Sequence, residues 1–381
     1  MEGHEALLSA AQAETGLRDF GHESFLEGLE ILVRSLHKEA RLNALGERAL
    51  RQRIVGHLKQ RLQVEDWYRR HPEIENQQIK TPLIGLGLPR TGSTALSCLL
   101  AEDPNARSLR RWEAAEPCPP PGTVKGPDPR IERDSQRQAD AKSHTPTSAT
   151  GPTECQDLMA LDFKAQIFNA LAQVPSYSEW LLDADLTPTY LYERRVLKLL
   201  QWQFPARPWR LKAPTHILYL DHLNRTFPDA RFVMTHRDPT EVMVSVAGVY
   251  ADIIANFSDR VDARYIGKLN VEQWSIGMNR ALAFRDSGND GRFYDIDFRA
   301  MHRDPIGEVR DLYAWLGEPV SVEFADGMAR WWKHNSETRE GSAHPDAATY
   351  GLDLDRVRPL FAEYSARAAV WATNRGAPHA C

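Results

Sequence analysis

The sequence lacks the features by which several large classes of proteins are recognised. Its 381 residues contain only four cysteines, with no C-x-x-C pair, and the 13 histidines form no H-x-x-x-H or H-E-x-x-H motif. The first 14 residues have neither the basic start nor the apolar centre of a secretory signal, and no apolar run approaches the ~20 residues of a membrane span. The sequence therefore predicts no metal site and no transmembrane segment, and it favours a reduced, cytoplasmic location.

A basic charge balance and a serine-hydrolase motif are missing too. The formal net charge is −5 at pH 7, which argues against a general nucleic-acid binder, because the footprint of such proteins is basic. No G-x-S-x-G elbow occurs. What is present is a hydrophobic content of 42% in a chain longer than most single cores, so we expect one large domain with helical additions or two closely associated parts.

The most informative stretch is residues 81–94, which read TPLIGLGLPRTGST. A short apolar run is punctuated by Gly85 and Gly87, passes through a turn that contains Pro89 and Arg90, and continues into apolar residues at helical spacing. Strand, tight turn and helix in this order aim a row of backbone N–H groups at an anion. We predict a phosphate-binding loop here; the alternative is an ordinary strand–turn–helix junction that contains an arginine.

This loop departs from the nucleoside-triphosphate pattern at one position. From Gly87 to Thr94 the spacing is G-x-x-x-x-G-S-T, so Ser93 stands where the triphosphate loop has the lysine that reaches the β- and γ-phosphates. Without that lysine, binding of a triphosphate with Mg²⁺ loses its main point charge, whereas a single phosphate still suits the loop. A cation stands in the turn instead, at Arg90.

A second candidate anion site follows in residues 231–250, RFVMTHRDPTEVMVSVAGVY. The start of this segment predicts a short buried strand, and Asp238 with Glu241 predicts a capping box at the start of a helix. Arg237 then lies at the carboxyl tip of the strand, and Ser245 lies two turns into the helix. Because ligands bind at the carboxyl ends of the strands in an open parallel sheet, the two sites predict a ligand with two separated anionic groups.

These segments resemble those of the sulfotransferase family. PRTGST followed by a helix resembles the family's 5′-phosphosulfate loop, THRDPTEVMVSV resembles its 3′-phosphate segment, and WRLKAPTH at residues 209–216 is similar to its LK-x-P-x-H strand and turn. Further segments resemble a bacterial branch of the family: TGLRDFG (15–21), RRWEAAEPCPPP (110–121), TECQDL (153–158) and YGLD (350–353). The resemblance covers most of the chain.

The resemblance implies transfer of a sulfuryl group from 3′-phosphoadenosine 5′-phosphosulfate (PAPS) to a hydroxyl or amine, without a metal and with adenosine 3′,5′-bisphosphate as the product. It implies that Arg90 contacts the 5′-phosphate and the leaving oxygen, and that Lys212 contacts the transferring sulfonate. Cations at these places suit a reaction in which negative charge shifts towards the leaving phosphate. The other implied contacts are backbone N–H and hydroxyl donors of Thr91, Gly92, Ser93 and Thr94 at the 5′-phosphate, and Arg237 and Ser245 at the 3′-phosphate.

The acceptor hydroxyl needs a general base, for which there are two candidates. Cytosolic sulfotransferases carry a histidine two residues past a lysine that resembles Lys212, but this position is Pro214 here. His216 could take over the role; other branches use a glutamate, which Glu154 could supply at a predicted helix start. We prefer Glu154. The alternatives are that Glu154 is an acid favoured by the helix dipole and that His216 is a capping or packed residue.

Strands that alternate with helices predict an α/β fold, a P-loop-like doubly wound parallel sheet flanked by helices. We divide the chain into a helical N-terminal extension (1–80) and a PAPS-binding α/β domain with a C-terminal helical part (81–381). The expected strands are 83–86, 107–112, 209–212, 231–236 and 292–296, and the expected helices include 24–46, ending at Gly46, 155–171, 189–204, 215–227 and 272–285.

Several properties stay open at this level. The acceptor could be a small molecule, a glycan or a lipid, and the N-terminal helix pair could serve a homodimer contact. Residues 125–148 are interpreted as a helix plus flexible loop, either a lid over the acceptor site or a solvated surface excursion. Lys333 and Arg339 are candidates for a C-terminal loop over the nucleotide.

Two other functions are alternatives. A nucleotide-dependent phosphotransferase could use the same loop, but the missing lysine weakens this hypothesis. A non-catalytic nucleotide-binding protein could keep the fold, but the presence of Arg90, Lys212 and Arg237 together argues against it.

Overall fold

The computed structural model describes residues 2–140, 148–338 and 346–373. The chain forms two compact units. Unit 1 comprises Met1–Ile79, Leu109–Ala206 and Tyr250–Val261, and unit 2 comprises Lys80–Ser108, Arg207–Val249 and Asp262–Cys381. The division into domains at residues 80 and 81 stays a prediction. Residues 109–206 group with the N-terminal helices in unit 1.

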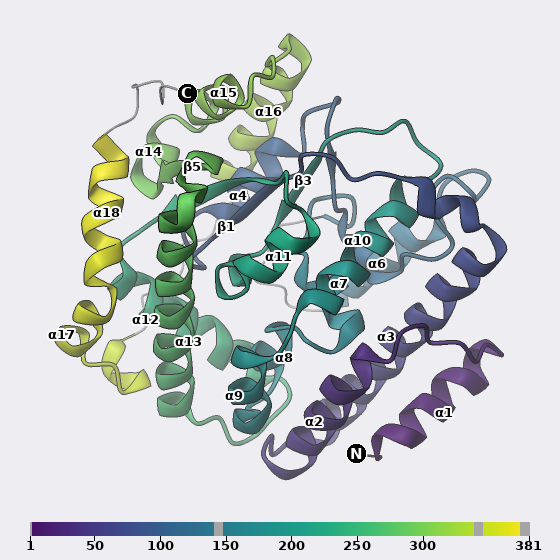
Figure 1. Ribbon diagram of the computed structural model, residues 1–381. Coiled ribbons are helices and arrows are strands. Elements are labelled where there is room, and N and C mark those ends of the chain that lie inside the picture. Colours follow the sequence, from purple (N-terminus) through teal and green to yellow (C-terminus); the bar gives the residue numbers. More distant parts are fainter. Residues whose placement is uncertain (1, 141–147, 339–345, 374–381) are drawn as a thin grey trace. The chain divides into compact units, whose positions relative to one another are not determined.

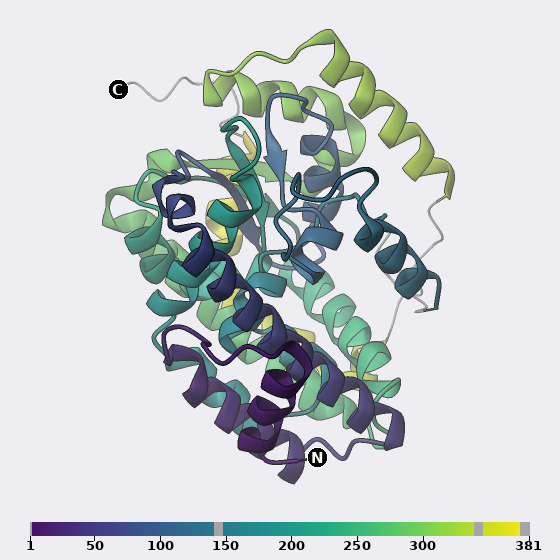
Figure 2. The ribbon, with the colours of Figure 1, turned by 90° about the vertical axis from the view of Figure 1, so that its right-hand side faces the viewer.

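Unit 1 is helical in the part of it that the structure describes. Its α2 turns one apolar stripe inward, with Phe25, Leu29, Leu32 and Leu36 buried as their spacing predicts. Figure 2 shows the first three helices, in purple, side by side, with α1 packed along α3. The elements of unit 1 are α1 (His4–Thr15), α2 (Ser24–Lys38), α3 (Ala44–Arg70), η1 (Pro72–Asn76), α5 (Arg111–Ala115), α6 (Pro129–Asp140), α7 (Gln156–Met159), η2 (Ala160–Asp162), α8 (Ile167–Leu171), α9 (Pro175–Asp183) and α10 (Thr187–Gln201).

Two helix predictions in unit 1 are wrong. Gly46 does not end a helix but lies in the first turn of α3, because the side chain of Asn43 accepts a hydrogen bond from the Gly46 N–H at 2.8 Å and caps the helix. The single helix expected over 155–171 is divided among α7, η2 and α8. Phe163 takes a left-handed φ of 53° directly after η2, and no helix can continue through that conformation.

Unit 2 contains a parallel sheet, which confirms the predicted doubly wound α/β fold (Figure 1). Its strands are β1 (Leu83–Gly87), β2 (Arg107–Ser108), β3 (Trp209–Lys212), β4 (Arg231–His236) and β5 (Phe293–Asp297), in the order β2-β3-β1-β4-β5. The first strand in sequence therefore lies at the centre, paired with β3 on one side and β4 on the other. The strands that follow β1 lie on both sides of it, β2 and β3 on one side and β4 and β5 on the other, and ligands bind at such switch points in the strand order.

Helices cover both faces of this sheet, as a parallel sheet requires. On one face Leu83, Val233 and Ile296 pack in one core with residues of α4, α14, α15 and α16. On the other face the ring of Phe232 contacts Phe293 and Phe284, the last residue of α13. The helices of unit 2 are α4 (Ser93–Leu100), η3 (Pro214–Leu218), α11 (Leu220–Thr226), α13 (Ala263–Phe284), η4 (Arg285–Asn289), η5 (Asp290–Arg292), α14 (Phe298–Arg303), α15 (Pro305–Leu316), α16 (Val322–Thr338), η6 (Ala347–Tyr350), α17 (Leu354–Val357), η7 (Arg358–Phe361) and α18 (Ala362–Thr373). The remaining helix, α12 (Pro239–Ala255), starts in unit 2 and enters unit 1 at Tyr250.

The strand predicted over 107–112 is mostly wrong. Only Arg107 and Ser108 pair with β3, and Trp112 lies in α5. The reason is local: Glu113, in the first turn of α5, accepts a hydrogen bond from the Arg110 N–H at 3.4 Å and forms a capping box.

The regions expected to cover the two substrates are described in part. The helix expected within 125–148 is α6, whereas residues 141–147 lie outside the described residues. Lys333 lies in α16, and Arg339 is also outside the described residues. Within the described ranges no helix is both long and apolar enough to cross a membrane.

Candidate active site

The predicted phosphate loop connects β1 to α4 at the carboxyl edge of the sheet. Every residue of β1 is buried, and the chain then turns through Arg90 and Gly92, whose φ angles of 62° and 88° are both left-handed. Gly92 is the N-cap of α4 and provides no side chain to bond the first N–H groups of that helix. A Cβ here would lie 3.4 Å from the ring of Phe298 as well as strain the backbone. The helix end can therefore receive an anion.

Thr91 holds the loop in this shape. Its side chain is fully buried, and its hydroxyl donates to the carbonyl of Leu88 at 2.8 Å. The same hydroxyl lies 2.6 Å from that of Thr235 in β4. The Thr91 hydroxyl thus ties the loop to the neighbouring strand, and the group that this residue can offer to a phosphate is its backbone N–H.

Lys212 brings a cation to the first turn of α4. It is the last residue of β3, opposite Gly85 in the parallel register, and its ammonium donates to the Thr94 hydroxyl at 3.4 Å. A Cβ on Gly85 would lie 3.1 Å from the Lys212 Cγ. Glycine at this position therefore provides the space that the lysine side chain occupies. Only 6% of Lys212 is exposed, which keeps its position well defined.

The second predicted anion site is joined to the first by hydrogen bonds. Arg90 Nε donates to the hydroxyl of Ser245 in α12 at 3.2 Å. Arg237, which follows β4, donates from Nη1 to the carbonyl of Arg90 at 3.1 Å. The structure therefore brings the ends of β1 and β4 and the first turns of α12 together, as the sequence predicts.

Glu241 has a different role from the predicted one. Its carboxylate does not complete a capping box but pairs with Arg237, at 3.0 Å from Nε and 2.9 Å from Nη2. Asp238 alone caps α12, accepting the Thr240 N–H at 2.8 Å. Burial acts to raise the pKa of Asp238, but the hydrogen bonds from Thr240 and Glu241 outweigh it and lower the pKa.

Phe298 is a site residue that the sequence reasoning missed. Its ring lies beside Gly92, and the guanidinium carbon of Arg237 stands 4.6 Å from the ring centroid, within cation–π range. The available signal was its position directly after β5, because side chains that follow the carboxyl ends of parallel strands face the ligand edge. The aromatic ring restrains the cation from one side.

The two candidate bases differ in their surroundings. His216 lies in η3 of unit 2 and is 1% exposed, and burial lowers its pKa to about 3. Glu154 belongs to unit 1, where it is half-buried just before α7 and accepts a hydrogen bond from Gln156 Nε2 at 3.0 Å. The other predicted site residues belong to unit 2.

Comparisons with known proteins identify the family of this chain. A model of the sulfotransferase family matches residues 82–322. The crystal structure of sulfotransferase STF9 from Mycobacterium avium is similar at a TM-score of 0.88 and 30% identity, over 96% of this chain and 97% of that one. For sulfotransferase STF1 from Mycobacterium tuberculosis H37Rv the TM-score is 0.83 and the identity 32%, over 94% and 98% of the two chains.

A curated relative adds a named acceptor. Omega-hydroxy-beta-dihydromenaquinone-9 sulfotransferase Stf3 from Mycobacterium tuberculosis is 26% identical over 157 residues, and the match spans 38% of this chain and 38% of the relative. The family match contains the phosphate loop, Lys212 and Arg237. The resemblance to bacterial sulfotransferases is thereby confirmed, and this chain belongs to the sulfotransferase family.

Proposed function

We propose that this protein transfers a sulfuryl group from PAPS to a hydroxyl or amine of a small-molecule, glycan or lipid acceptor, without a metal. The observation that carries the proposal is the linked pair of anion sites in unit 2. The open end of α4 lies next to Lys212, and Arg237 bonds the same loop through the carbonyl of Arg90. A donor with a 5′-phosphosulfate and a 3′-phosphate has two anionic groups for two such sites.

The 5′-phosphosulfate fits the loop between β1 and α4. The N–H groups from Thr91 to Thr94 would hold the phosphate, and Arg90 would neutralise part of its charge. Ser93 in place of a lysine disfavours a triphosphate, which supports PAPS over ATP with Mg²⁺.

The 3′-phosphate fits Arg237 and Ser245. The present partner of Arg237 is Glu241, whose side chain is 52% exposed, and exposed ion pairs of this kind contribute only about 0–1 kcal/mol. A phosphate can take over the guanidinium at little cost. Recognition of this phosphate is what distinguishes PAPS from other adenosine phosphates.

The chemistry follows from the same residues. When bound, PAPS supplies the sulfuryl group and leaves as adenosine 3′,5′-bisphosphate. Lys212 and Arg90 would stabilise the charge that develops on the leaving oxygen, the kind of interaction that contributes most to such reactions. We keep Glu154 as the base, because a buried histidine with a pKa of about 3 takes up a proton only at a cost of several kcal/mol.

Replacing each candidate base separately tests this choice. In Glu154→Gln we expect turnover to be lost while adenosine 3′,5′-bisphosphate still binds, because only the proton acceptor is removed. In His216→Gln we expect turnover to persist. Retained turnover in Glu154→Gln, with loss in His216→Gln, would make His216 the base.

The acceptor class and the location of the protein in the cell are proposed from two other observations. The name of the mycobacterial relative states a hydroxylated menaquinone, so a lipid-soluble quinone alcohol is the first acceptor to test. We also propose a cytoplasmic location, because Cys98, Cys118 and Cys155 are buried and form no disulfide within the described residues. The homodimer stays a prediction.

Calorimetric titration of the wild-type protein tests the proposed donor. We expect adenosine 3′,5′-bisphosphate to bind with micromolar or tighter affinity, about −8 kcal/mol, without a metal. AMP should bind about tenfold to a hundredfold more weakly, because it leaves Arg237 without its phosphate. Arg237→Gln should bring the two nucleotides to similar affinities. Equal binding of both by the wild-type protein, or tighter binding of ATP with Mg²⁺, would overturn the proposal.

A further inference from the structure

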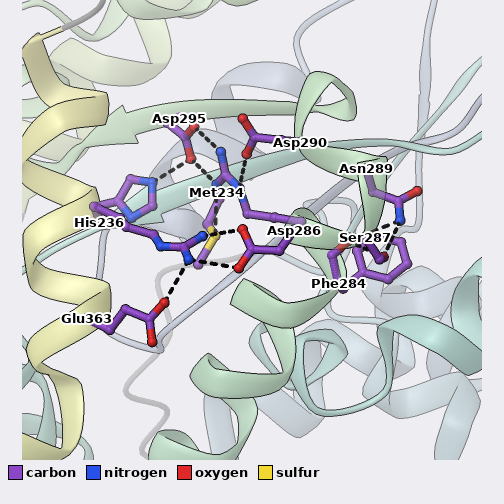
Figure 3. A network of polar contacts seen from close by, with 11 residues as sticks. Met234, His236, Phe284, Asp286, Ser287, Asn289, Asp290, Asp295 and Glu363 are labelled. Carbon is purple, nitrogen blue, oxygen red and sulfur yellow. Dashed lines mark hydrogen bonds and ion pairs between the residues drawn. The ribbon is translucent and has the colours of Figure 1, made fainter.

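A buried network of polar side chains ends at Arg237. His236 is the last residue of β4, and its Nε2 lies 2.8 Å from an oxygen of Asp295 in the neighbouring strand β5. Figure 3 shows the two side chains facing each other, with the α18 ribbon beside them. His236 directly precedes the arginine to which we assign the 3′-phosphate, so its position bears on that site.

The carboxylate of Asp295 is held firmly. Arg285, the residue after α13, donates to both of its oxygens at 2.8 Å and also bonds Asp290. Burial alone would raise the pKa of Asp295, but the hydrogen bonds and charges of Arg285 and His236 outweigh it and lower the pKa to about 2. Asp295 is therefore ionised at neutral pH and directs the Nε2–H of His236 towards itself.

Tyr364 of α18 joins this network to the backbone of Arg237. Its hydroxyl lies 3.2 Å from Nδ1 of His236, and the Arg237 backbone N–H lies close enough to the same hydroxyl to oppose the rise that burial causes in the pKa of Tyr364. In a neutral imidazole with the proton on Nε2, Nδ1 is an acceptor. The hydroxyl can thus accept from the Arg237 N–H and donate to His236, so each group has a partner.

Other residues of α18 fasten the helix to the same place. Trp371 stacks over the guanidinium of Arg285, at 3.7 Å from Cζ to the ring centroid, and lies 5.1 Å from the His236 ring. Arg367 makes two bonds to Asp286 and one to Glu363 farther out (Figure 3). Both anchors follow Tyr364 in α18, so they fasten the helix between the Tyr364 contact and its C-terminal end.

We propose that Tyr364, His236, Asp295 and Arg285 form a positioning network that holds the backbone of Arg237 where its side chain meets the 3′-phosphate. Tyr364 is the positioning residue that α18 contributes, although it lies 128 positions from His236 in the sequence. The inference rests on the proposed assignment of Arg237 to the 3′-phosphate. It adds that the C-terminal helix sets how well this phosphate is recognised.

The test is Tyr364→Phe, which keeps the ring and removes only the hydroxyl. Two measurements are made: the ratio of AMP to adenosine 3′,5′-bisphosphate dissociation constants, and hydrogen exchange of the Arg237 amide. We expect the ratio to fall about tenfold, with AMP affinity nearly unchanged, because one anchoring hydrogen bond is lost. We expect the amide to exchange faster, while amides of β1 keep their protection.

Two control variants separate positioning from general stability. Tyr313→Phe removes another buried hydroxyl of unit 2, which donates to Asp103 at 2.7 Å, so it should cost similar stability without changing the nucleotide ratio. Arg367→Gln removes two ion pairs of α18 but leaves the Tyr364 hydroxyl and the Trp371 contact in place, so it should also keep the ratio.

Each outcome decides the inference. A nucleotide ratio and an Arg237 amide both unchanged in Tyr364→Phe would overturn it, and so would an equal fall of the ratio in Tyr313→Phe. If the wild-type protein does not distinguish the two nucleotides, the proposed function fails and the inference falls with it. If the wild type distinguishes them and only the variant loses the distinction, both stand.

Discussion

Two arginines, one in each unit, show opposite uses of the same side chain. Arg61 of unit 1 is completely buried, and its guanidinium donates to the carbonyls of Phe20 and His22, at 2.9 and 2.6 Å, and to Asp162 at 3.2 Å. In unit 2, the Arg237 side chain is 24% exposed and pairs with Glu241, which is more exposed still. Arg61 is enclosed in the interior of its unit, whereas Arg237 is partly exposed at the carboxyl end of β4.

The two arginines differ in the free energy that it costs to replace a protein partner by a ligand. Removing a partner of Arg61 leaves a charge uncompensated in the interior, which is strongly destabilising. The pair of Arg237 and Glu241 is held in high dielectric and contributes little. A cation is therefore available to a ligand when its protein contacts are weak, and this property distinguishes Arg237, for which we propose a binding role, from the structural Arg61.

The largest expected effect is on stability, from Arg61→Met. Because Asp162 would remain buried without its cation, we expect a loss of about 3–5 kcal/mol, measured by denaturant unfolding. The double variant Arg61→Met with Asp162→Leu removes both charges. It should recover part of the lost unfolding free energy. A single variant within about 1 kcal/mol of the wild type would contradict this use of Arg61.

Lys212→Met should affect the reaction more than the fold. We expect the turnover rate to fall about 100- to 1000-fold, because the cation that we propose for the leaving oxygen is lost, while the unbranched side chain still fills the space next to Gly85. Steady-state kinetics with a fixed acceptor measure the fall, and thermal unfolding is the control. A turnover rate within about threefold of the wild type would remove Lys212 from the mechanism.

Glu193 of unit 1 extends the comparison to a buried acid without a cation. Burial raises its pKa to about 8, although a hydrogen bond with Cys155 opposes the shift. The folded state then binds the proton more tightly than the unfolded state, so this contribution to stability is complete below pH 4.5 and is lost as the pH rises to about 8.

The test compares Glu193→Gln with the wild type at several pH values. From pH 6 to 8 the wild type should lose up to about 2.7 kcal/mol relative to the variant. Unfolding midpoints at each pH measure this difference, and Glu179→Gln on the exposed surface is the matched control. Parallel stability curves for Glu193→Gln and wild type would show that the carboxyl is not neutral in the fold.

The smallest expected effect is that of Ser245→Ala. Its hydroxyl accepts from Arg90 at 3.2 Å, and at the proposed site it would also contact the 3′-phosphate. A hydrogen bond to a charged group is worth about 1.5–3 kcal/mol, so adenosine 3′,5′-bisphosphate should bind about tenfold more weakly, at the lower end of this range because the site is partly exposed. A loss as large as that expected for Arg237→Gln would mean that Ser245 also holds Arg90 in position.

Features that depend on neighbours in the sequence were predictable. The bounds of β3 and β4 agree with the predicted strands, and the phosphate loop lies between its predicted strand and helix. Phe163 and Asn43 show where this reasoning fails: a left-handed residue after η2 and a cap at the start of α3 changed the predicted helices. Both depend on single side chains or backbone conformations that hydrophobic periodicity does not report.

By itself, the sequence predicted the parallel α/β fold and the segments of the two proposed anion sites, because these depend on short-range patterns of apolar residues, glycines and caps. The family was indicated by the resemblance of its motifs and shown by the family match. The tertiary structure alone decided which side chains meet. His236 and Asp295 are 59 positions apart, and Lys212 and Thr94 are 118 apart. Such pairs arise from strand order and register, which bring distant residues together through packing that no local pattern encodes.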